Sequence, residues 1–218
     1  MKSRGASSYP NSVFRGEPGE SVLEFVRERS FGVLTVAGPT GVLAAHVPFV
    51  LRETRILAHL MRVNPLARHL LDGPTDALLI VSGPDGYISP DWYGETQLVP
   101  TWNYVAVHLR GELRLQNDMA LREVLDRLSE VLEKRLAPKP PWKVDKIENG
   151  LLEKKMQHIV PIEMSVQSID STFKLNQNRS ESARGSAAKA LTAGGTPGME
   201  TRRLAALMEG VSNRSADD

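Results

Sequence analysis

The chain has 218 residues, 41% of them hydrophobic and 24% charged, a composition typical of a globular protein with room for one core. Its formal net charge of +1 gives no general attraction to nucleic acid, and the absence of cysteine excludes disulfides, thiolate metal sites and cysteine nucleophiles. The longest apolar run, 77–81, is too short to span a bilayer, and the first residues contain no apolar signal core. We therefore expect a cytoplasmic protein with no membrane association.

The N-terminal part of the chain predicts a short helix followed by β-hairpins. Residues 1–8 are small and polar, and we expect a disordered extension there. A helix is predicted over 17–29, because proline and acidic residues stand in its first turn. Strands are predicted over 31–37, 42–51 and 56–60, because Gly-Pro-Thr-Gly and Arg-Glu-Thr-Arg turns separate them.

The middle of the chain alternates between short helices and strands. Residues 65–71 predict a helix with Asn64 as its N-cap, and 77–82 predict a strand buried on both faces. Odd positions of 105–115 are apolar or glycine and even positions are mostly polar, which indicates a strand with one packed face. Asp118 is expected to cap an amphipathic helix that follows.

The last part of the chain predicts one more strand and a helical tail. A helix near 149–158 precedes an alternating strand that begins at Val160. Residues 180–218 predict a tail of two helices with a glycine-rich break at 194–198. Six or more hairpin-linked strands with few helices favour a mostly β (α+β) fold, an antiparallel barrel over 9–179 with peripheral helices.

The strand over 42–51 is the first candidate site. His46 lies on the face opposite Val47 and Phe49, and Pro48 cannot donate a hydrogen bond to a neighbouring strand. Free backbone groups beside Pro48 could therefore meet a ligand. The alternative is a histidine that only covers the barrel rim.

A second candidate lies where a strand ends and a helix begins, at His59, Arg62 and Asn64. An anion could bind here against the helix N-terminus, with Arg62 and His59 as further donors. The alternative is a surface ion pair beside an ordinary asparagine cap.

The aromatic segment 87–104 is the strongest candidate, because it contains two of the three tryptophans and three of the four tyrosines. Trp92 and Trp102 could stack on a flat ligand while Asn103 bonds to ring heteroatoms. The alternative is a structural plug at one barrel end. Downstream, the polar cluster 174–179 could be a ligand clamp or a solvated strand exit.

Several chemistries have no signature in the sequence. It has no glycine-rich phosphate loop, no metalloprotease helix and no Gly-x-Ser-x-Gly elbow. The five histidines lack the close paired spacing of a zinc site. The basic stretch 134–146 is interrupted by prolines and is interpreted as a solvated face.

Several motifs, in their order along the chain, resemble the PaiB family, the FMN-binding negative transcriptional regulators. The similarity spans roughly residues 9–192 and departs at Asn176, where serine is more usual. The motifs are Tyr9-Pro10 with Phe14, Ala45-His46-Val47-Pro48-Phe49, Ala58-His59 with Arg62 and Asn64-Pro65, Tyr87-Ile88-Ser89-Pro90-Asp91-Trp92-Tyr93, Val99-Pro100-Thr101-Trp102-Asn103-Tyr104, and Lys174-Leu175-Asn176-Gln177-Asn178.

The resemblance implies an FMN-binding split β-barrel related to pyridoxamine-phosphate oxidase, working as a homodimer with flavin at the subunit interface. It assigns cofactor contacts but no catalytic residue and no metal ligand. The segment around His46, Val47 and Pro48 would follow the isoalloxazine ring. The phosphate would lie near His59, Met61, Arg62 and Asn64, and the ring pocket would be closed by Trp92, Trp102, Asn103, Lys174, Gln177 and Asn178.

Three functions are compatible with this resemblance. The first is a flavin-dependent regulator, although the net charge offers no support for direct DNA contact. The second is a flavin oxidoreductase, in which the protein orients the cofactor. The third is haem binding or degradation, with His46, His108 or His158 as the axial ligand.

Overall fold

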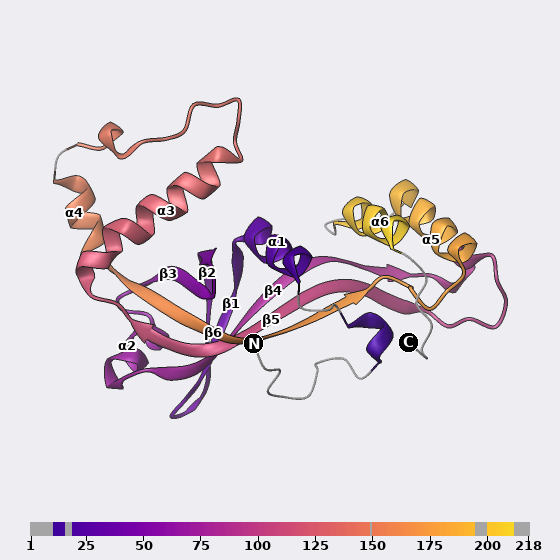
Figure 1. Ribbon diagram of the computed structural model, residues 1–218, viewed down its shortest axis with the longest axis horizontal. Coiled ribbons are helices and arrows are strands. Elements are labelled where there is room, and N and C mark those ends of the chain that lie inside the picture. The colour runs from indigo at the N-terminus through magenta and orange to yellow at the C-terminus, as the bar shows by residue number, and fades with distance from the viewer. Residues whose placement is uncertain (1–10, 16–18, 149, 195–199, 212–218) are drawn as a thin grey trace. The chain divides into compact units, whose positions relative to one another are not determined.

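The computed structural model describes residues 11–15, 19–148, 150–194 and 200–211. Six antiparallel strands form a closed barrel in the order β1-β2-β3-β6-β5-β4 (Figure 1), which confirms the predicted barrel. The predicted extension 1–8 and most of the glycine-rich break 194–198 lie outside the described residues. The strands are β1 (Phe31–Gly38), β2 (Gly41–Arg52), β3 (Arg55–Met61), β4 (Thr75–Ile88), β5 (Thr101–Leu115) and β6 (Ile159–Lys174).

Within the described ranges, six α-helices accompany the strands, and short 3-10 helices lie between these elements. Among the described residues, none of the helices is long and apolar enough to cross a membrane. The helices are α1 (Glu20–Arg29), α2 (Pro65–His69), α3 (Leu121–Lys134), α4 (Leu151–Met156), α5 (Glu181–Gly194) and α6 (Thr201–Gly210).

The chain divides into two compact units, which are described separately below. Unit 1 consists mainly of residues 24–81 and 108–169, and unit 2 of residues 3–23, 82–107 and 170–218. Three long strands, β4, β5 and β6, contribute segments to both units.

Unit 1 contains the two hairpins that the sequence predicted. β1 pairs with β2 from Phe31–Pro48 to Gly38–Gly41, and β2 pairs with β3 from Phe49–Ala58 to Arg52–Arg55. β3 pairs on its other side with β6. Alternate side chains enter the core because strand residues alternate between faces. Leu34, Val47, Phe49 and Ala58 are all buried on this inner face.

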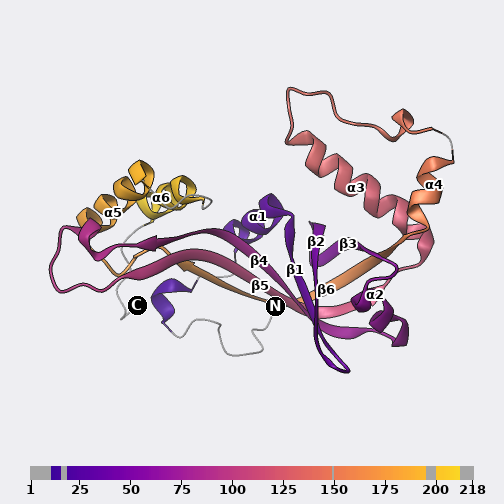
Figure 2. The same ribbon diagram turned by 180° about the vertical axis from the view of Figure 1, so that it is seen from behind.

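The helices of unit 1 follow their capping residues closely. Asn64 caps α2, its side chain accepting a bond of 2.9 Å from the Leu66 N–H, as predicted, and α2 lies against β1 and β2 (Figure 2). The predicted Asp118 cap is wrong. Asn117 accepts from the Met119 N–H at 2.9 Å, and a 3-10 turn precedes α3.

α3 lies against β2 and β3 (Figure 1), and its apolar stripe faces them. Val124 and Leu128 pack with Val50 and Leu57 in one cluster. The opposite face of α3 is polar and carries exposed ion pairs such as Arg122–Asp126. The helix therefore has one face suited to the barrel and one suited to solvent.

β4 is longer than predicted and is not buried on both faces. It continues through Ser82-Gly83-Pro84-Asp85-Gly86, which in sequence is typical of a turn, and its residues alternate in burial. In β6 the predicted apolar positions Val160, Ile162, Met164 and Val166 are buried, but positions 161 and 163 between them are buried as well. Glu163 interrupts the pattern, since Arg114 Nη2 lies 2.6 Å and Arg55 Nη1 3.8 Å from its carboxylate.

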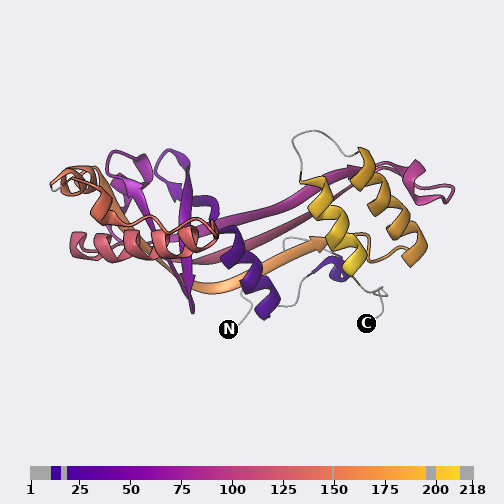
Figure 3. The same cartoon turned by 90° about the horizontal axis from the view of Figure 1, so that it is seen from above.

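Unit 2 contains the predicted C-terminal helices, which pack side by side (Figure 3). Ala187, Leu191, Leu204 and Met208 are among their buried residues. α6 approaches β4 closely at Gly86, where an added Cβ would lie 3.0 Å from Leu204 Cδ2. α5 and α6 are therefore packed parts of unit 2.

Candidate functional site

The thirteen predicted site residues separate into one group in each unit. Unit 1 contains seven of them: His46, Val47, Pro48, His59, Met61, Arg62 and Asn64. Unit 2 contains six: Trp92, Trp102, Asn103, Lys174, Gln177 and Asn178.

The ladder between β2 and β3 stops at Pro48, and proline chemistry explains why. The Phe49 N–H donates to Ser30 O at 3.0 Å, so Phe49 faces β1 and its neighbours Pro48 and Val50 face β3. The β2–β3 register runs from Arg52–Arg55 to Phe49–Ala58. The next hydrogen-bonded pair would join Pro48 to His59, and proline has no N–H to donate.

Beyond this point the two strands keep their other partners. Residues 46–48 continue to pair with β1, and residues 59–61 continue to pair with β6. The edges of β2 and β3 that face each other therefore carry backbone groups outside the ladder. Such edges are suited to hydrogen bonding with a ligand.

Side chains on the outer face of this opened ladder form a partly apolar surface. Phe31 and Met61 are each 53% exposed, and the Phe31 and His46 rings stack with centroids 6.2 Å apart at 29°. Pro48 lies directly opposite Phe31 in the β1–β2 register, two residues after His46 on the same face of β2. We call Phe31, His46, Pro48, His59 and Met61 the outer patch of unit 1.

Val47 is not part of the outer patch. It is 1% exposed and points into the barrel core, on the face opposite His46. Only the backbone of Val47 is placed to touch a ligand on the outer face.

His59 has an unusual environment within the patch. Its Nδ1 is buried and has no hydrogen-bond partner among the described residues. Burial lowers the pKa of His59 below its ordinary value of 6.5, so the imidazole is neutral at pH 7. It can hydrogen-bond to a ligand but brings no positive charge to an anion.

Arg62 is held in place by three elements of unit 1. Its Nε donates to Gln157 O at 3.1 Å and its Nη2 to Ile159 O at 3.3 Å. Nη2 also lies 3.3 and 3.2 Å from the two carboxylate oxygens of Asp118. Asn64, which was expected beside Arg62 on the same anion, uses its side-chain oxygen to cap α2.

A hollow of about 520 Å³ lies beside the Arg62–Asp118 pair. It carries one cation and two carboxylates over a partly apolar floor. Its lining residues are Arg62, Asp118, Leu121, Glu153, Met156 and Gln157.

In unit 2 the aromatic motif divides between two faces of β5. Trp102 is 41% exposed and meets Tyr87 edge-on, with ring centroids 6.3 Å apart. Asn103 is fully buried on the other face, where its Nδ2 donates to Met208 Sδ at 3.4 Å. Successive strand residues point to opposite faces, so Trp102 and Asn103 do not share one ligand surface.

The other aromatic residues of the motif have mixed roles. Trp92 is half-buried in the 3-10 helix Pro90–Tyr93. Tyr93 is buried, its hydroxyl accepts from Asn176 Nδ2 at 3.0 Å, and burial raises its pKa. Tyr93 therefore has the packing role expected of a structural plug, whereas the Tyr87 and Trp102 side chains are exposed at the surface.

The polar cluster that follows β6 mostly serves the chain itself. Lys174 Nζ donates to Thr101 Oγ1 at 2.7 Å. The Gln177 side chain accepts from the Leu175 N–H at 2.8 Å and donates to Phe173 O. Asn178 is exposed. The cluster is therefore a built strand exit, of which Asn178 is the most accessible member.

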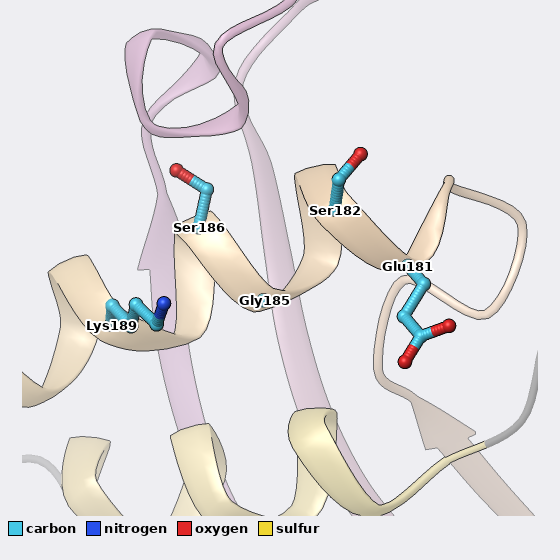
Figure 4. A pocket seen from close by; sticks show the side chains of 5 residues that line it. All are labelled: Glu181, Ser182, Gly185, Ser186 and Lys189. Atoms are coloured by element: carbon cyan, nitrogen blue, oxygen red, sulfur yellow. The ribbon is translucent and has the colours of Figure 1, made fainter.

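Unit 2 has a second hollow, of about 660 Å³, on the outer side of α5. Figure 4 shows Ser182 and Ser186 projecting from the same side of the helix, with Glu181 and Lys189 at either end. It includes none of the predicted site residues. In the part of the chain that the structure describes, no cluster of three His, Asp or Glu residues could hold a metal ion.

Sequence reasoning missed two residues of this region. Phe31 lies in an apolar run without a visible period, and only the β1–β2 register brings it beside His46. Asp118 stands 56 positions from Arg62, and no short-range pattern links them.

Comparison with known proteins gives a consistent family. The family model described as "Putative FMN-binding domain" matches residues 8–168. The chain is 33% identical over 177 residues to "Protease synthase and sporulation protein PAI 2" of Bacillus subtilis, which covers 79% of this chain and 84% of that protein. A second relative, an uncharacterized protein of Emericella nidulans, is 25% identical over 207 residues, covering 75% of this chain and 82% of that protein.

Solved structures share the fold at low sequence identity. The FAD and heme binding protein of Mycobacterium smegmatis has a TM-score of 0.54 at 14% identity and covers 73% of both chains. The flavocytochrome Anf3 of Azotobacter vinelandii has a TM-score of 0.53 at 16% identity, covering 73% of this chain and 69% of that one. The architecture is therefore that of a split barrel.

Proposed function

Because the chain belongs to the PaiB family of FMN-binding domains, we propose that it binds FMN with the isoalloxazine ring on the outer patch of unit 1. The observation that carries this proposal is the β2–β3 ladder ending at Pro48. It places backbone groups that are outside the ladder beside the outer patch, which presents the rings of Phe31 and His46, and a flavin has both a planar ring face and a polar rim. Redox chemistry, where it occurs, would be supplied by the bound flavin.

The residues present fit this cofactor group by group. The stacked Phe31–His46 pair offers a planar contact for the ring. The backbone of 46–48 and the neutral His59 offer donors and acceptors for its polar edge. Arg62 would supply a cation for the phosphate, through a charge-assisted bond.

We extend the proposal to a cytoplasmic homodimer with a regulatory role, as the resemblance implies. The exposed Tyr87–Trp102 pair is an aromatic surface that a second subunit could bring to the flavin. A ligand that binds only the assembled state stabilises the dimer by mass action. Flavin would then control the assembly, and direct DNA contact is not part of the proposal.

A second candidate is haem binding, and one observation favours it. His46 is exposed and already stacked against an aromatic ring, as an axial ligand beside a macrocycle would be. An oxidoreductase is the third candidate, with the same flavin site.

Reconstitution tests these functions together. The apoprotein is titrated with FMN, riboflavin and haem, each followed by visible absorption, while light scattering gives the mass. We expect saturable FMN binding and a mass of two chains. Rapid reduction of the bound flavin by NAD(P)H would favour the oxidoreductase. A haem band lost on His46→Ala, without flavin binding, would contradict the proposal.

A further inference from the structure

The hollow beside Arg62 has the wrong net charge for a simple phosphate pocket. Arg62 contributes one positive charge, and Asp118 and Glu153 contribute two negative ones. A flavin phosphate carries between one and two negative charges near pH 7. Its attraction to Arg62 is therefore opposed by the two carboxylates of the same hollow.

The contacts of Arg62 also determine which edge of the guanidinium faces a ligand. Nε and Nη2 are directed to Gln157 O, Ile159 O and the Asp118 carboxylate. Considering the described residues, Nη1 is the nitrogen left for a phosphate oxygen. Asp118 would then be a neighbour of the phosphate across one guanidinium group.

We propose that Asp118 is a specificity-determining residue that weakens the preference of the site for phosphorylated over unphosphorylated flavin. This inference rests on the proposed FMN site and adds to it how strongly the phosphate is held. The Asp118 carboxylate partly neutralises the positive charge of Arg62 and repels the incoming phosphate. A site of this kind exchanges FMN readily, which suits a protein that responds to flavin level.

Removing only the charge of Asp118 separates this effect from its structural contact. Asp118→Asn keeps an oxygen acceptor near Nη2, and Gln157 O and Ile159 O still hold the guanidinium. FMN affinity should rise by roughly 3- to 30-fold at low salt, because the repulsion between the carboxylate and the phosphate is removed. The gain is limited to this range because Arg62 and Asp118 are partly exposed and solvent screens their charges. Riboflavin affinity should stay unchanged.

The experiment measures dissociation constants of FMN and riboflavin for the full chain by flavin fluorescence. Asp126→Asn is the matched control, because Asp126 is also an exposed aspartate, paired with Arg122 at 2.9 Å but away from the hollow. Glu153→Gln, like Asp118→Asn, should raise the ratio of FMN affinity to riboflavin affinity. The gain of Asp118→Asn should shrink as salt is added.

The outcomes separate this inference from the proposed function. If riboflavin binds and the FMN-to-riboflavin ratio of Asp118→Asn is unchanged or lower, the role of Asp118 is wrong while the flavin site stands. An equal gain for both flavins would also overturn it, since that reports a general change in the fold. If neither flavin binds to the unaltered chain, the proposed function fails and this inference with it.

Discussion

Replacing Gly111 by alanine should lower the free energy of unfolding by about 3 kcal/mol or more. Gly111 lies on the buried face of β5, where an added Cβ would stand 1.9 Å from Ser165 O and 2.8 Å from Ser165 C on β6. Both are backbone atoms, so no side chain can rotate away. The two strands would have to separate in unit 1, and the ladder that closes the barrel would be damaged.

Urea unfolding followed by circular dichroism measures this loss. Gly185→Ala is the control, because Gly185 lies within α5 and an added Cβ there meets nothing within 4 Å. It should gain about 0.5–1 kcal/mol from the helix preference of alanine. If the urea midpoint of Gly111→Ala equals that of the parent protein, the backbones of β5 and β6 are not in close contact at Gly111 and Ser165.

Replacing Arg184 by alanine should destabilise unit 2 by about 2–4 kcal/mol. Arg184 is only 3% exposed, although arginine is rarely buried unless it is paired. Its Nη2 donates to Val211 O at 2.8 Å, which ties α5 to the residue that follows α6. Alanine would leave a cavity and remove the donor from that carbonyl.

Hydrogen exchange resolves this loss by segment. Amides of 201–210 should lose protection first in Arg184→Ala, whereas those of β1–β3 should keep theirs. Arg202→Ala is the control, because Arg202 is exposed on α6 and its removal should cost less than about 0.5 kcal/mol. Unchanged protection of α6 in Arg184→Ala would mean that apolar packing alone holds the helix.

Much of the barrel could be predicted from local sequence. The three N-terminal strands were recognised because turn sequences separate them, and β5 because its residues alternate. Asn64 was recognised as a cap because its type and the following proline agree. These signals act within a few residues, so no knowledge of the tertiary structure was needed.

Other features depended on contacts that are distant in sequence. The strand predicted over 77–82 ends too early, because β4 continues to Ile88, and Gly86 is needed where α6 approaches. β6 was expected to alternate between apolar and polar positions, yet Glu163 is buried in it. The burial is possible because Arg114 reaches Glu163 from β5 and Arg55 reaches it from β3. Tertiary packing overrides local preference at both places.

The candidate site shows the same division. Pro48 was correctly identified as the point where β2 loses a ladder partner, because the missing N–H is a property of one residue. Trp102 and Asn103 could be assigned to opposite faces only once the start of β5 was known, and β5 begins at Thr101 rather than at 105. The Asp118 contact of Arg62 required the whole arrangement of unit 1.

The most direct measurement of the central proposal is an FMN titration of the Phe31→Asp variant. Phe31 is half-exposed, so the fold should be kept, while a carboxylate on the outer patch would be buried beneath the ring. FMN affinity should fall at least about tenfold. The same change at Val42, which is 76% exposed at the other end of the β1–β2 hairpin, should leave it unaltered. Equal FMN affinities for Phe31→Asp and the parent protein would place the flavin elsewhere.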